Sequence, residues 1–369
     1  MPKAVETVLE IDLNSLAHNY RFLRSKLYPS TKFMAVVKAF AYGSDAVEIA
    51  KKLENLGADY FAVAYANEGI ALRKGGIKCP ILVLHPIPAN LGILIDHRLE
   101  PNIYSVKILR EFLKSIQGKG HIGYPIHLKF NTGLNRLGFL EKDLDIVLEH
   151  LTKRKDIMVA SIFSHLAASE DRNEGVFTLN QIAAFEKIAR ALGDKLGYIP
   201  MKHILNTSGI INYPEAQFNM VRSGIGLYGY GNEPDVDAQL RPVATLKTII
   251  SQIHHIGPHE SVGYNRAFLA DRPRTTATLP LGHADGIGRQ YGKGNTYVTI
   301  QGKKAPIIGN VCMDMIMIDI TGIHCKEGDE VIIFGKSPTA DEFAATAHTI
   351  SYELLTGISQ RVRRIIIEE

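Results

Sequence analysis

Lys38 directly follows the apolar run FMAVV (33–37) and precedes a loop that contains a Tyr-Gly pair. Such a run predicts a buried strand, so Lys38 would extend from a rigid strand end. Lysine is almost never buried without a partner, and an amine held out of water has a lowered pKa and can form a Schiff base. A lysine at a strand end can also reach solvent with its ammonium group. Lys38 alone therefore leaves a reactive amine and an ordinary surface residue as open interpretations.

Basic and hydrogen-bonding side chains also stand at the ends of four other apolar runs. They are Lys129 with Asn131, His165, Asn206 with Thr207, and Arg222. In a (β/α)₈ barrel the catalytic side chains gather at the carboxyl ends of the strands, so these residues and Lys38 would share one face. Each residue alone has an ordinary explanation, but their coincidence on one face predicts a functional site.

Three glycines near residue 225 have the spacing of a dinucleotide-binding fingerprint. Gly224, Gly226 and Gly229 match G-x-G-x-x-G. That motif should follow the first strand of a βαβ unit and precede an acidic residue by about 20 positions, whereas this one follows the last strand of the alternating region. A nicotinamide-dependent oxidoreductase is therefore the weaker interpretation.

The same glycines fit a site for a single phosphate better. Small residues let the backbone N–H groups of Gly224 and Ile225 approach a phosphate closely, and Thr207 or Ser208 would add a hydroxyl. Phosphate sites formed by the loops after strands seven and eight recur in barrels. A phosphate at one side and Lys38 at the other predict pyridoxal phosphate as the ligand.

The first two-thirds of the chain alternate strand-like and helix-like segments. Strands are expected at 32–38, 60–64, 80–85, 100–105, 125–131, 158–165, 203–207 and 220–226. Amphipathic helices lie between them, for example at 44–56 with Ser44 as its N-cap, and at 179–192. Eight such units over roughly 230 residues predict a TIM barrel, with a doubly wound open sheet as the alternative.

The pattern changes after the polar stretch 231–237. Short β-rich runs are expected at 243–253, 275–280, 295–300, 304–309, 316–320 and 330–334, with one helix at 341–347 that extends through 351–355. Runs of this length separated by Gly, Pro, Asn and Asp predict a mostly β domain. We therefore divide the chain into an α/β barrel at 1–235 and a β-rich domain at 236–369, which a first strand at about 7–12 can join.

Two motifs in the β-rich region carry side chains with chemical potential. Tyr264 stands in SVGYNRAF and Met313 in GNVCMDM; taken alone, they fit a surface tyrosine and a packed β core. His283 and Asp285 in LGHADG suggest an acid–base pair. No serine on an elbow-like turn accompanies that pair, so a hydrolase triad is not expected.

Composition restricts the class of protein. The chain has 369 residues, 46% hydrophobic and 22% charged, with a net charge of +4 and no basic block, so neither nucleic acid nor a membrane surface is an expected partner. The N-terminus lacks the apolar core of a signal peptide, and no stretch reaches the roughly 18 to 20 apolar residues of a spanning helix. Cys79, Cys312 and Cys325 are too few for a disulfide framework or a zinc site. We expect a cytoplasmic protein without a metal.

Taken together, five ordered segments resemble the alanine racemase family, pyridoxal-phosphate enzymes of fold type III, over essentially the full chain. They are AVVKAFAYG around Lys38, HLKFNTGLNRLGF at 127–139, NMVRSGIGLYG at 219–229, SVGYNRAF at 261–268 and GNVCMDM at 309–315. The resemblance implies pyridoxal 5'-phosphate as cofactor and alanine as substrate. It also implies a head-to-tail homodimer with shared active sites that supplies D-alanine for peptidoglycan.

The resemblance also implies the roles of individual residues. Lys38 would hold the cofactor covalently and act as one base, and Tyr264 would act as the second. Arg136 and Met313 would contact the substrate, Met313 through its backbone, and Lys129 matches a position that is carbamylated in some members, where it would brace Arg136. The cofactor contacts would come from Lys38, Tyr42, His165, Asn206, Thr207, Arg222, Gly224, Ile225 and Tyr352.

Four positions depart from the family's usual residues. Phe40 stands where Asn is usual, Asn131 where Asp is usual, Thr207 where Ser is usual and His283 where Tyr is usual. Thr207 keeps the hydroxyl, whereas Asn131 removes a charge beside Lys129 and His283 changes the expected access route. None of these departures touches the two expected bases.

Inversion of a stereocentre explains why two bases are needed. One proton must leave one face of Cα and another must arrive on the opposite face, which Lys38 and Tyr264 would serve. Both residue types ordinarily have a pKa near 10, too high for a good base at neutral pH. Desolvation would help Lys38, and Arg136 and the His165–Arg222 pair would help Tyr264. Arg222, facing the pyridine nitrogen, would leave that nitrogen unprotonated and so limit transamination.

Related functions stay open on the sequence alone. They are a racemase of another small amino acid, another fold type III enzyme such as a decarboxylase or aldolase, and a catalytically idle cofactor-binding module. Proton exchange at Cα without loss of CO₂ distinguishes the racemases from the other enzymes, and the idle module would not need the β-rich domain with Tyr264.

Overall fold

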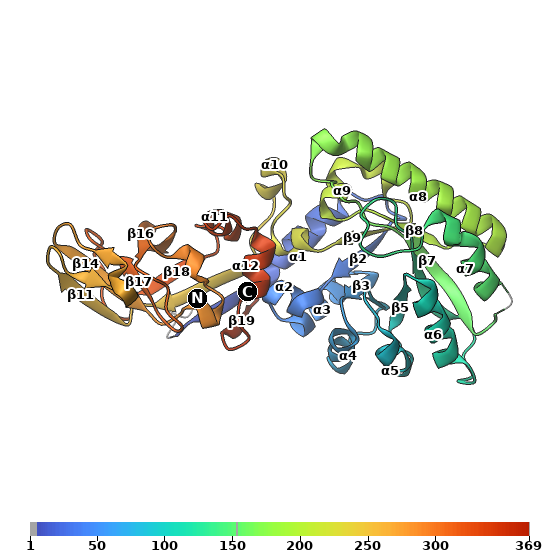
Figure 1. Cartoon of the computed structure of the whole chain (residues 1–369), viewed down its shortest axis with the longest axis horizontal. Helices are drawn as coiled ribbons and strands as arrows, with labels where there is room; N and C mark the ends of the chain where they lie inside the picture. Colours follow the sequence, from blue (N-terminus) through green and yellow to red (C-terminus); the bar gives the residue numbers. More distant parts are fainter. Residues whose placement is uncertain (1–5, 153, 369) are drawn as a thin grey trace.

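The computed structural model describes residues 6–152 and 154–368. Figure 1 shows two bodies beside each other, an α/β body that spans the first two-thirds of the chain and a mostly β body built from its last third. The predicted fold class, a barrel followed by a β-rich domain, is confirmed. The predicted division at 235/236 falls inside the short helix α10 (Pro234–Asp237).

Eight parallel strands form the barrel, in the order β8-β7-β6-β5-β4-β3-β2-β9. Their bounds are β2 (Lys32–Val36), β3 (Tyr60–Val63), β4 (Ile81–Val83), β5 (Glu100–Ile103), β6 (Tyr124–Lys129), β7 (Ile157–Phe163), β8 (Met201–His203) and β9 (Met220–Ser223). Two backbone hydrogen bonds of 3.1 Å, from Arg222 to Leu205 and from Asn219 to Lys202, join the β8 side to β9. These bonds close the ring, so the strand ends surround a common opening.

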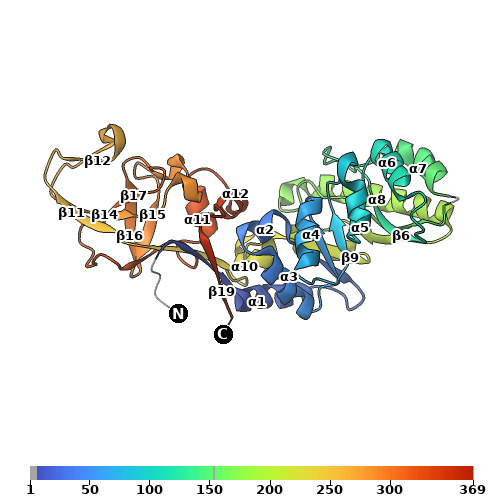
Figure 2. The ribbon, with the colours of Figure 1, turned by 90° about the horizontal axis from the view of Figure 1, so that it is seen from below.

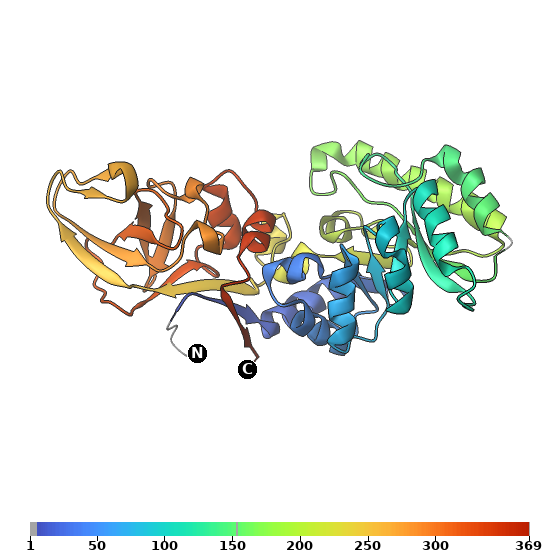
Figure 3. The ribbon, with the colours of Figure 1, turned by 60° about the horizontal axis from the view of Figure 1, so that its bottom comes forward.

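Helices cover the outside of the barrel (Figure 3). They are α1 (Leu13–Arg24), α3 (Ala46–Asn55), α4 (Ala66–Lys74), α5 (Leu91–Asp96), α6 (Val106–Ile116), α7 (Leu144–Leu151), α8 (Gly175–Leu196) and α9 (Thr207–Asn212). Helix α6 illustrates why they form: Ser105 caps it, and Ile108, Phe112 and Ile116 recur on one face and are buried. None of the helices in the described part of the chain is long and apolar enough to cross a membrane.

Several predicted bounds are corrected by the structure. The N-cap of α3 is Asp45, which accepts from the backbone N–H groups of Val47 and Glu48, and not Ser44. The longest helix, α8, begins and ends four residues beyond the predicted 179–192, because its exposed face interrupts the apolar spacing. The predicted strand at 203–207 ends at His203, since Asn206 already caps α9.

A nine-stranded sheet builds the second body, in the order β11-β14-β17-β16-β15-β18-β10-β1-β19. Its strands are β1 (Val8–Asp12), β10 (Ala244–Ile249), β11 (Gln252–Ile256), β14 (Arg274–Leu279), β15 (Tyr297–Ile300), β16 (Lys303–Ile308), β17 (Ile316–Asp319), β18 (Glu330–Phe334) and β19 (Arg363–Ile367). The N-terminal strand β1 lies between β10 and β19. The predicted run 243–253 splits into β10 and β11, because Ile250 and Ser251 bond to different neighbours, Asp329 and Thr278.

Two short helices of the second body face the barrel. They are α11 (Ala340–Ala345) and α12 (Ser351–Gly357), in place of the predicted helix at 341–347 extended through 351–355. Helix α12 packs against α2 (Lys38–Gly43) of the barrel. Strands β12 (Ser261–Val262) and β13 (Phe268–Leu269) form a separate hairpin, which Figure 2 shows at the end of the β-rich body farthest from the barrel. Helix α12 thus lies at the barrel mouth, whereas the β12–β13 hairpin lies far from it.

Candidate functional site

One cavity of about 660 Å³ opens at the carboxyl ends of the barrel strands, a size typical of sites for small ligands. Its lining comprises Val36, Lys38, Tyr42, Ala64, Tyr65, Leu84, His85, Lys129, Arg136, Leu137, Phe163, His165, Asn206, Thr207, Arg222, Gly224, Ile225 and Tyr352. All residues with an expected role toward cofactor or substrate except Tyr264 and Met313 are in this set, whereas Asn131, two residues beyond β6, is not. The barrel and α12 of the second body thus bring together residues that lie more than 300 positions apart in the chain.

Positive charge dominates this cavity. Lys38, Lys129, Arg136 and Arg222 all reach it, and no Asp or Glu is among the described residues that line it. A concave site of one charge sign attracts ligands of the opposite sign. The cavity is therefore suited to an anionic ligand with an apolar body, which Val36 and other apolar lining residues would contact.

An unusual backbone conformation positions Lys38. Strand β2 ends at Val36, and Lys38 begins α2, whereas the sequence predicted a strand through Lys38. Residues 39–42 have φ between 52° and 55° and ψ between 42° and 58°, so this segment is a left-handed turn. Each non-glycine residue in the left-handed conformation costs about 1–2 kcal/mol of conformational free energy. Phe40, half of whose surface is exposed, occupies a position where the family's usual Asn would adopt this conformation more readily.

Contacts at both ends hold this left-handed turn. The Glu68 carboxylate of α4 accepts hydrogen bonds from the backbone N–H groups of Ala39 and Ala64. At the other end, the Arg364 guanidinium of β19 donates to the Gly43 carbonyl at 2.8 and 3.2 Å. Strained backbone persists where the surroundings fix it and is typical of functional sites. Contacts from both bodies therefore fix the direction in which Lys38 leaves the strand.

The two lysines of the cavity have lowered pKa values. Burial lowers the pKa of Lys38, the charge of Arg136 lowers it further, and Glu68 partly opposes the shift. Burial, Arg136, Arg222 and Lys38 together lower the pKa of Lys129 to about 8. A lower pKa leaves more of each amine neutral near pH 7, and only the neutral amine is a nucleophile or a base.

Arg222 lies at the floor of the cavity and is 5% exposed. Its guanidinium donates to His203 Nδ1 at 2.6 Å and to His165 Nδ1 at 3.1 Å. Burial lowers the pKa of Arg222 to about 9, and burial with the charge of Arg222 holds the pKa values of both histidines well below the usual range. Because Arg222 can only donate, both imidazoles accept at Nδ1 and are neutral.

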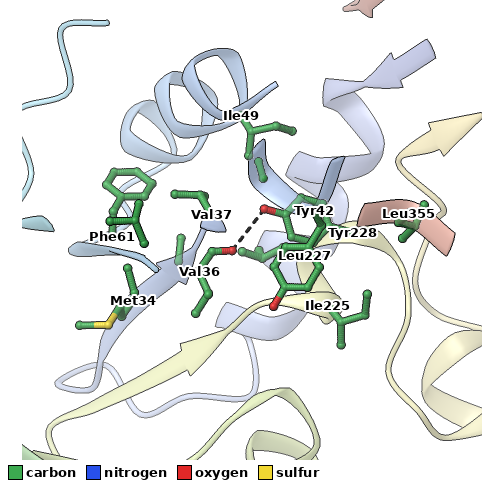
Figure 4. Close-up of a cluster of buried hydrophobic side chains, with 14 of the residues drawn as sticks. Met34, Val36, Val37, Tyr42, Ile49, Phe61, Ile225, Leu227, Tyr228 and Leu355 are labelled. Atoms are coloured by element: carbon green, nitrogen blue, oxygen red, sulfur yellow. Dashed lines mark hydrogen bonds between the residues drawn. The ribbon is translucent and has the colours of Figure 1, made fainter. Parts of the chain in front are cut away.

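Hydroxyl groups and small residues gather on the side of the cavity next to α12. The Tyr42 ring stacks on Tyr228 with centroids 4.5 Å apart (Figure 4), and Thr207 Oγ1 lies 3.0 Å from Ser223 Oγ. A Cβ at Gly224 would lie 2.1 Å from Tyr42 Oη, so only glycine fits there. Tyr352 reaches the same side from α12. This side offers hydroxyl and backbone donors, which suit a phosphate.

Tyr264 and Met313 lie outside this cavity. Tyr264 stands in the short 3₁₀ turn Tyr264–Arg266 between β12 and β13, with 72% of its surface exposed, and Met313 is 59% exposed. The Asn310 amide donates to the Tyr264 carbonyl at 3.0 Å, which ties the two loops together. Within one chain, the two expected bases therefore occupy separate sites.

Comparisons with known proteins identify the family. The family profile "Alanine racemase, N-terminal domain" matches residues 11–232, and "Alanine racemase, C-terminal domain" matches residues 243–366. The chain is 38% identical to "Alanine racemase 1" of Clostridium acetobutylicum over 369 residues, which covers 97% of this chain and 95% of that protein. This chain belongs to the alanine racemase family. Members of the family are isomerases that depend on pyridoxal phosphate, and the chain acts as a racemase.

Solved structures agree with this family. An alanine racemase of Clostridium difficile 630 superimposes with a TM-score of 0.93 at 34% identity and covers 100% of this chain and 97% of its own. An alanine racemase of Bartonella henselae with covalently bound pyridoxal phosphate gives a TM-score of 0.90 at 29% identity, covering 99% and 100% of the two chains. Both likenesses extend over the barrel and the β-rich body together.

The cavity fits the cofactor on which the alanine racemase family depends. The Lys38 amine, the buried Arg222 at the floor and the donor-rich side formed by Tyr42, Thr207 and Gly224 are parts of one pocket. An aldehyde, a ring nitrogen and a phosphate would each have a chemically suitable neighbour there. The space beside Tyr42 Oη is open because residue 224 is a glycine, and the Cβ of any larger residue would fill it. No cluster of metal-binding side chains occurs among the described residues.

The structure also decides two alternative interpretations of motifs. Gly224, Gly226 and Gly229 surround the 3₁₀ turn Ile225–Tyr228 after the last barrel strand, and not the start of a βαβ unit, so they are no dinucleotide fingerprint. The Asp285 carboxylate pairs with Arg361 at 2.7 and 2.9 Å. Asp285 therefore has a structural partner other than His283, which argues against a hydrolase-type acid–base pair.

Several residues in and around this cavity were not predicted from the sequence. Glu68 is an ordinary surface-type residue at the third position of a helix, although its place three residues after Tyr65 is typical of a capping box. His203 was expected to begin the strand 203–207, away from the carboxyl end that carries site residues, yet it ends β8 and is the shortest contact of Arg222. His85 lines the cavity from the end of the expected strand 80–85, so the same strand-end pattern could have indicated it, whereas Leu137 lies in a loop for which the sequence pattern gives no signal.

Proposed function

We propose that the protein interconverts L-alanine and D-alanine by a two-base mechanism, with Lys38 and Tyr264 as the bases. The observation that supports this most strongly is the position of Lys38, a partly desolvated amine in a cation-lined cavity at the barrel strand ends. Pyridoxal phosphate, when bound, makes the Cα proton of the substrate acidic by accepting its electrons. Lys38 Nζ then takes or returns the proton on one face of Cα, and Tyr264 Oη serves the other face.

The other lining residues orient the ligands in this proposal. Tyr42, Asn206, Thr207, Ile225 and Tyr352, with the backbone at Gly224, hold the phosphate side of the cofactor. The Arg136 guanidinium binds the substrate carboxylate, for which its planar pair of donors is suited, and the backbone of Met313 supports the substrate from the side of Tyr264.

Arg222 has a separate part in the proposal. It meets the ring nitrogen of the cofactor with His165 behind it, and it can donate a hydrogen bond but cannot accept one. Arg222 would therefore leave that nitrogen unprotonated, which would weaken the electron withdrawal that the cofactor supplies and limit transamination.

We also propose that Lys129 carries a carbamate. Its pKa of about 8 leaves a substantial fraction of neutral amine at neutral pH, and a neutral amine adds to CO₂ with loss of one proton. The new carboxylate would place a negative charge beside Arg136 and Arg222, the same groups whose charge now lowers the Lys129 pKa. It would brace Arg136 in the orientation that binds the substrate.

We propose a cytoplasmic enzyme that supplies D-alanine for cell-wall peptidoglycan. The three cysteines, Cys79, Cys312 and Cys325, are all unpaired, as is usual in a reducing compartment.

Racemisation in deuterated water tests the proposed reaction. Purified protein with pyridoxal phosphate should convert L-alanine to D-alanine, and the product should carry one deuterium at Cα because its new proton comes from solvent-exchanged bases. Chiral chromatography with mass spectrometry measures both. Removal of the cofactor by hydroxylamine should abolish conversion, and its addition should restore it. Release of CO₂, or inversion of another amino acid in preference to alanine, would contradict the proposal.

We further propose that two chains form a head-to-tail homodimer and that each active site combines Lys38 of one chain with Tyr264 of its partner. A proton acceptor must lie within about 3 Å of its proton, yet Tyr264 is largely exposed and does not line the cavity that holds Lys38. A twofold dimer with one contact surface on each chain completes both sites at once.

Hybrid dimers provide a direct test of shared sites. Lys38→Ala and Tyr264→Phe chains with different affinity tags are co-expressed, and mixed dimers are isolated by two successive affinity steps. One site of each mixed dimer is then intact and the other carries both changes, so we expect about half the wild-type turnover per dimer. A doubly tagged wild-type dimer is the control. Activity no higher than that of the two single-variant homodimers would show that both bases come from one chain.

A further inference from the structure

A continuous chain of polar side chains crosses the interior of the barrel below the cavity. Five consecutive strands contribute one residue each: Glu100 from β5, His127 from β6, Ser161 from β7, His203 from β8 and Arg222 from β9. All five side chains are buried, Glu100 with 8% and Arg222 with 5% of its surface exposed. Barrel interiors are ordinarily filled by Val, Ile and Leu, so a polar layer here requires an explanation.

Four short hydrogen bonds connect these residues in order. Glu100 Oε2 lies 2.6 Å from His127 Nε2, and His127 Nδ1 lies 2.6 Å from Ser161 Oγ. Ser161 Oγ lies 2.9 Å from His203 Nε2, and His203 Nδ1 lies 2.6 Å from the Arg222 guanidinium. The chain of contacts therefore extends without a gap from a carboxylate to the cation at the floor of the cavity.

One arrangement of protons, with every donor pointing the same way, satisfies the chemistry of both ends. Arg222 can only donate, so His203 accepts at Nδ1 and carries its proton on Nε2. That proton is donated to Ser161 Oγ, whose own hydroxyl proton then points to His127 Nδ1. His127 consequently carries its proton on Nε2 and donates it to Glu100, which as a carboxylate only accepts. Each donor in the chain points toward Glu100.

Stacking holds the last imidazole of this chain in place. The Phe163 ring lies parallel to His203 at a centroid distance of 4.8 Å, and the Arg222 guanidinium carbon lies 5.4 Å from the centroid of the same ring. Arg222 also donates to the carbonyl groups of Ser164 and Ile204, at 2.8 and 3.0 Å. Rotation of the His203 ring would therefore break both its bond to Ser161 and its bond to Arg222.

We infer that Glu100, His127, Ser161 and His203 are positioning residues that set the tautomer of His203 and thereby hold Arg222 in the orientation in which it meets the cofactor. This inference rests on the proposed function of Arg222 at the cofactor ring. An ordered hydrogen-bond chain polarises its members and fixes their protons. Glu100 specifies the direction of the chain from the opposite side of the barrel, without contact to substrate or cofactor.

Removal of the central hydroxyl tests the inference. In Ser161→Ala the Nε2 proton of His203 has no acceptor in the chain, so the imidazole is free to adopt the other tautomer, which would place an N–H against the donor of Arg222. We expect kcat to fall at least about tenfold, by analogy with the loss caused by removing the hydrogen-bond partners of metal-binding histidines. The absorption spectrum of the bound cofactor should change as well, because its ring nitrogen loses a fixed partner.

Two further variants separate this effect from a general loss of packing. Ser161→Thr keeps the hydroxyl and should restore both the spectrum and most of kcat. Ser15→Ala removes another buried hydroxyl, which donates to Asp12, the N-cap of α1, at 2.8 Å, and should leave both readouts unchanged. If Ser161→Ala does not fold, Glu100→Gln replaces it, since this change keeps the volume and exchanges a carboxylate that only accepts for an amide that can also donate, so the end of the chain no longer sets its direction. The same spectral change is expected for Glu100→Gln.

A measurement without cofactor distinguishes failure of this inference from failure of the proposed function. In the apoprotein labelled with ¹⁵N-histidine, two-bond ¹H–¹⁵N spectra should show the His203 proton on Nε2, with assignment by His203→Gln. This signature should be lost or averaged in Ser161→Ala. Unchanged tautomer, spectrum and kcat in Ser161→Ala would overturn the inference. Absence of racemisation by the wild-type protein, with the tautomer shift still present, would instead reject the proposed function and leave the hydrogen-bond chain as found.

Discussion

Lys38→Ala is expected to lower the racemisation rate by about 10⁴-fold or more, the upper end of what a positioned proton carrier contributes. The variant loses one of the two proposed bases, and it also loses the amine that would hold the cofactor covalently. No neighbour replaces it easily, because Lys129, the other lysine of the cavity, extends from β6 and not from the end of β2. The cofactor should then dissociate on gel filtration, whereas it stays with the wild-type protein.

Borohydride reduction followed by intact mass measurement checks this prediction. Wild-type protein should gain the mass of one reduced cofactor per chain, and Lys38→Ala should gain none. Lys32→Ala is the matched control, since Lys32 begins the same strand at its opposite, exposed end. Added methylamine should restore part of the turnover of Lys38→Ala by supplying a free amine. Covalent labelling of the variant at an unchanged yield would show that another residue carries the cofactor.

The barrel was predictable from the sequence because its units are local. Each apolar run followed by an amphipathic helix carries its own signal, and Ile108, Phe112 and Ile116 in α6 illustrate how directly that signal becomes a buried face. The end of β2 was not predictable in the same way. The apolar run continues through Val37 to Lys38, and the left-handed turn that begins there depends on Glu68 and Arg364, which are distant in sequence.

The residues of the site likewise fall into those that local sequence could predict and those that it could not. Residues at strand ends, such as Lys38, His165 and Arg222, could be proposed together because parallel strands place their carboxyl ends on one side. The hydrogen-bonded side chains from Glu100 to Arg222 could not be proposed from the sequence. Glu100 and Ser161 stand within strands, and His127 connects them only when the barrel strands are side by side. The proposed pairing of Lys38 with Tyr264 could be predicted neither from strand ends nor from the fold of one chain. It depends on a second chain, so the fold of one chain leaves the two residues apart and only the family resemblance suggests their meeting.

Tyr264→Phe is the replacement that separates the two proposed bases. It keeps the ring and removes the oxygen that carries the proton, so racemisation should fall by about 10²–10⁴-fold. Both directions must fall equally, because the two enantiomers have the same free energy and the equilibrium constant stays at one. Tyr264 is largely exposed within its own chain, and the change keeps the ring, so the stability of the folded chain should change by no more than about 0.5 kcal/mol, as is usual for surface substitutions. A change in rate without a change in unfolding temperature would thus reflect chemistry.

Exchange of the Cα proton with solvent, measured by ¹H NMR for each enantiomer separately in deuterated water, reveals which base serves which face. In Tyr264→Phe, Lys38 remains, so the enantiomer whose proton faces Lys38 should continue to exchange while keeping its configuration. The other enantiomer presents its proton to the missing hydroxyl and should exchange at least about 10²-fold more slowly. Tyr28→Phe, which changes an exposed tyrosine near the end of α1, should behave as wild type. Equal exchange from both enantiomers in Tyr264→Phe would mean that a single base, or a base other than Tyr264, reaches both faces of Cα.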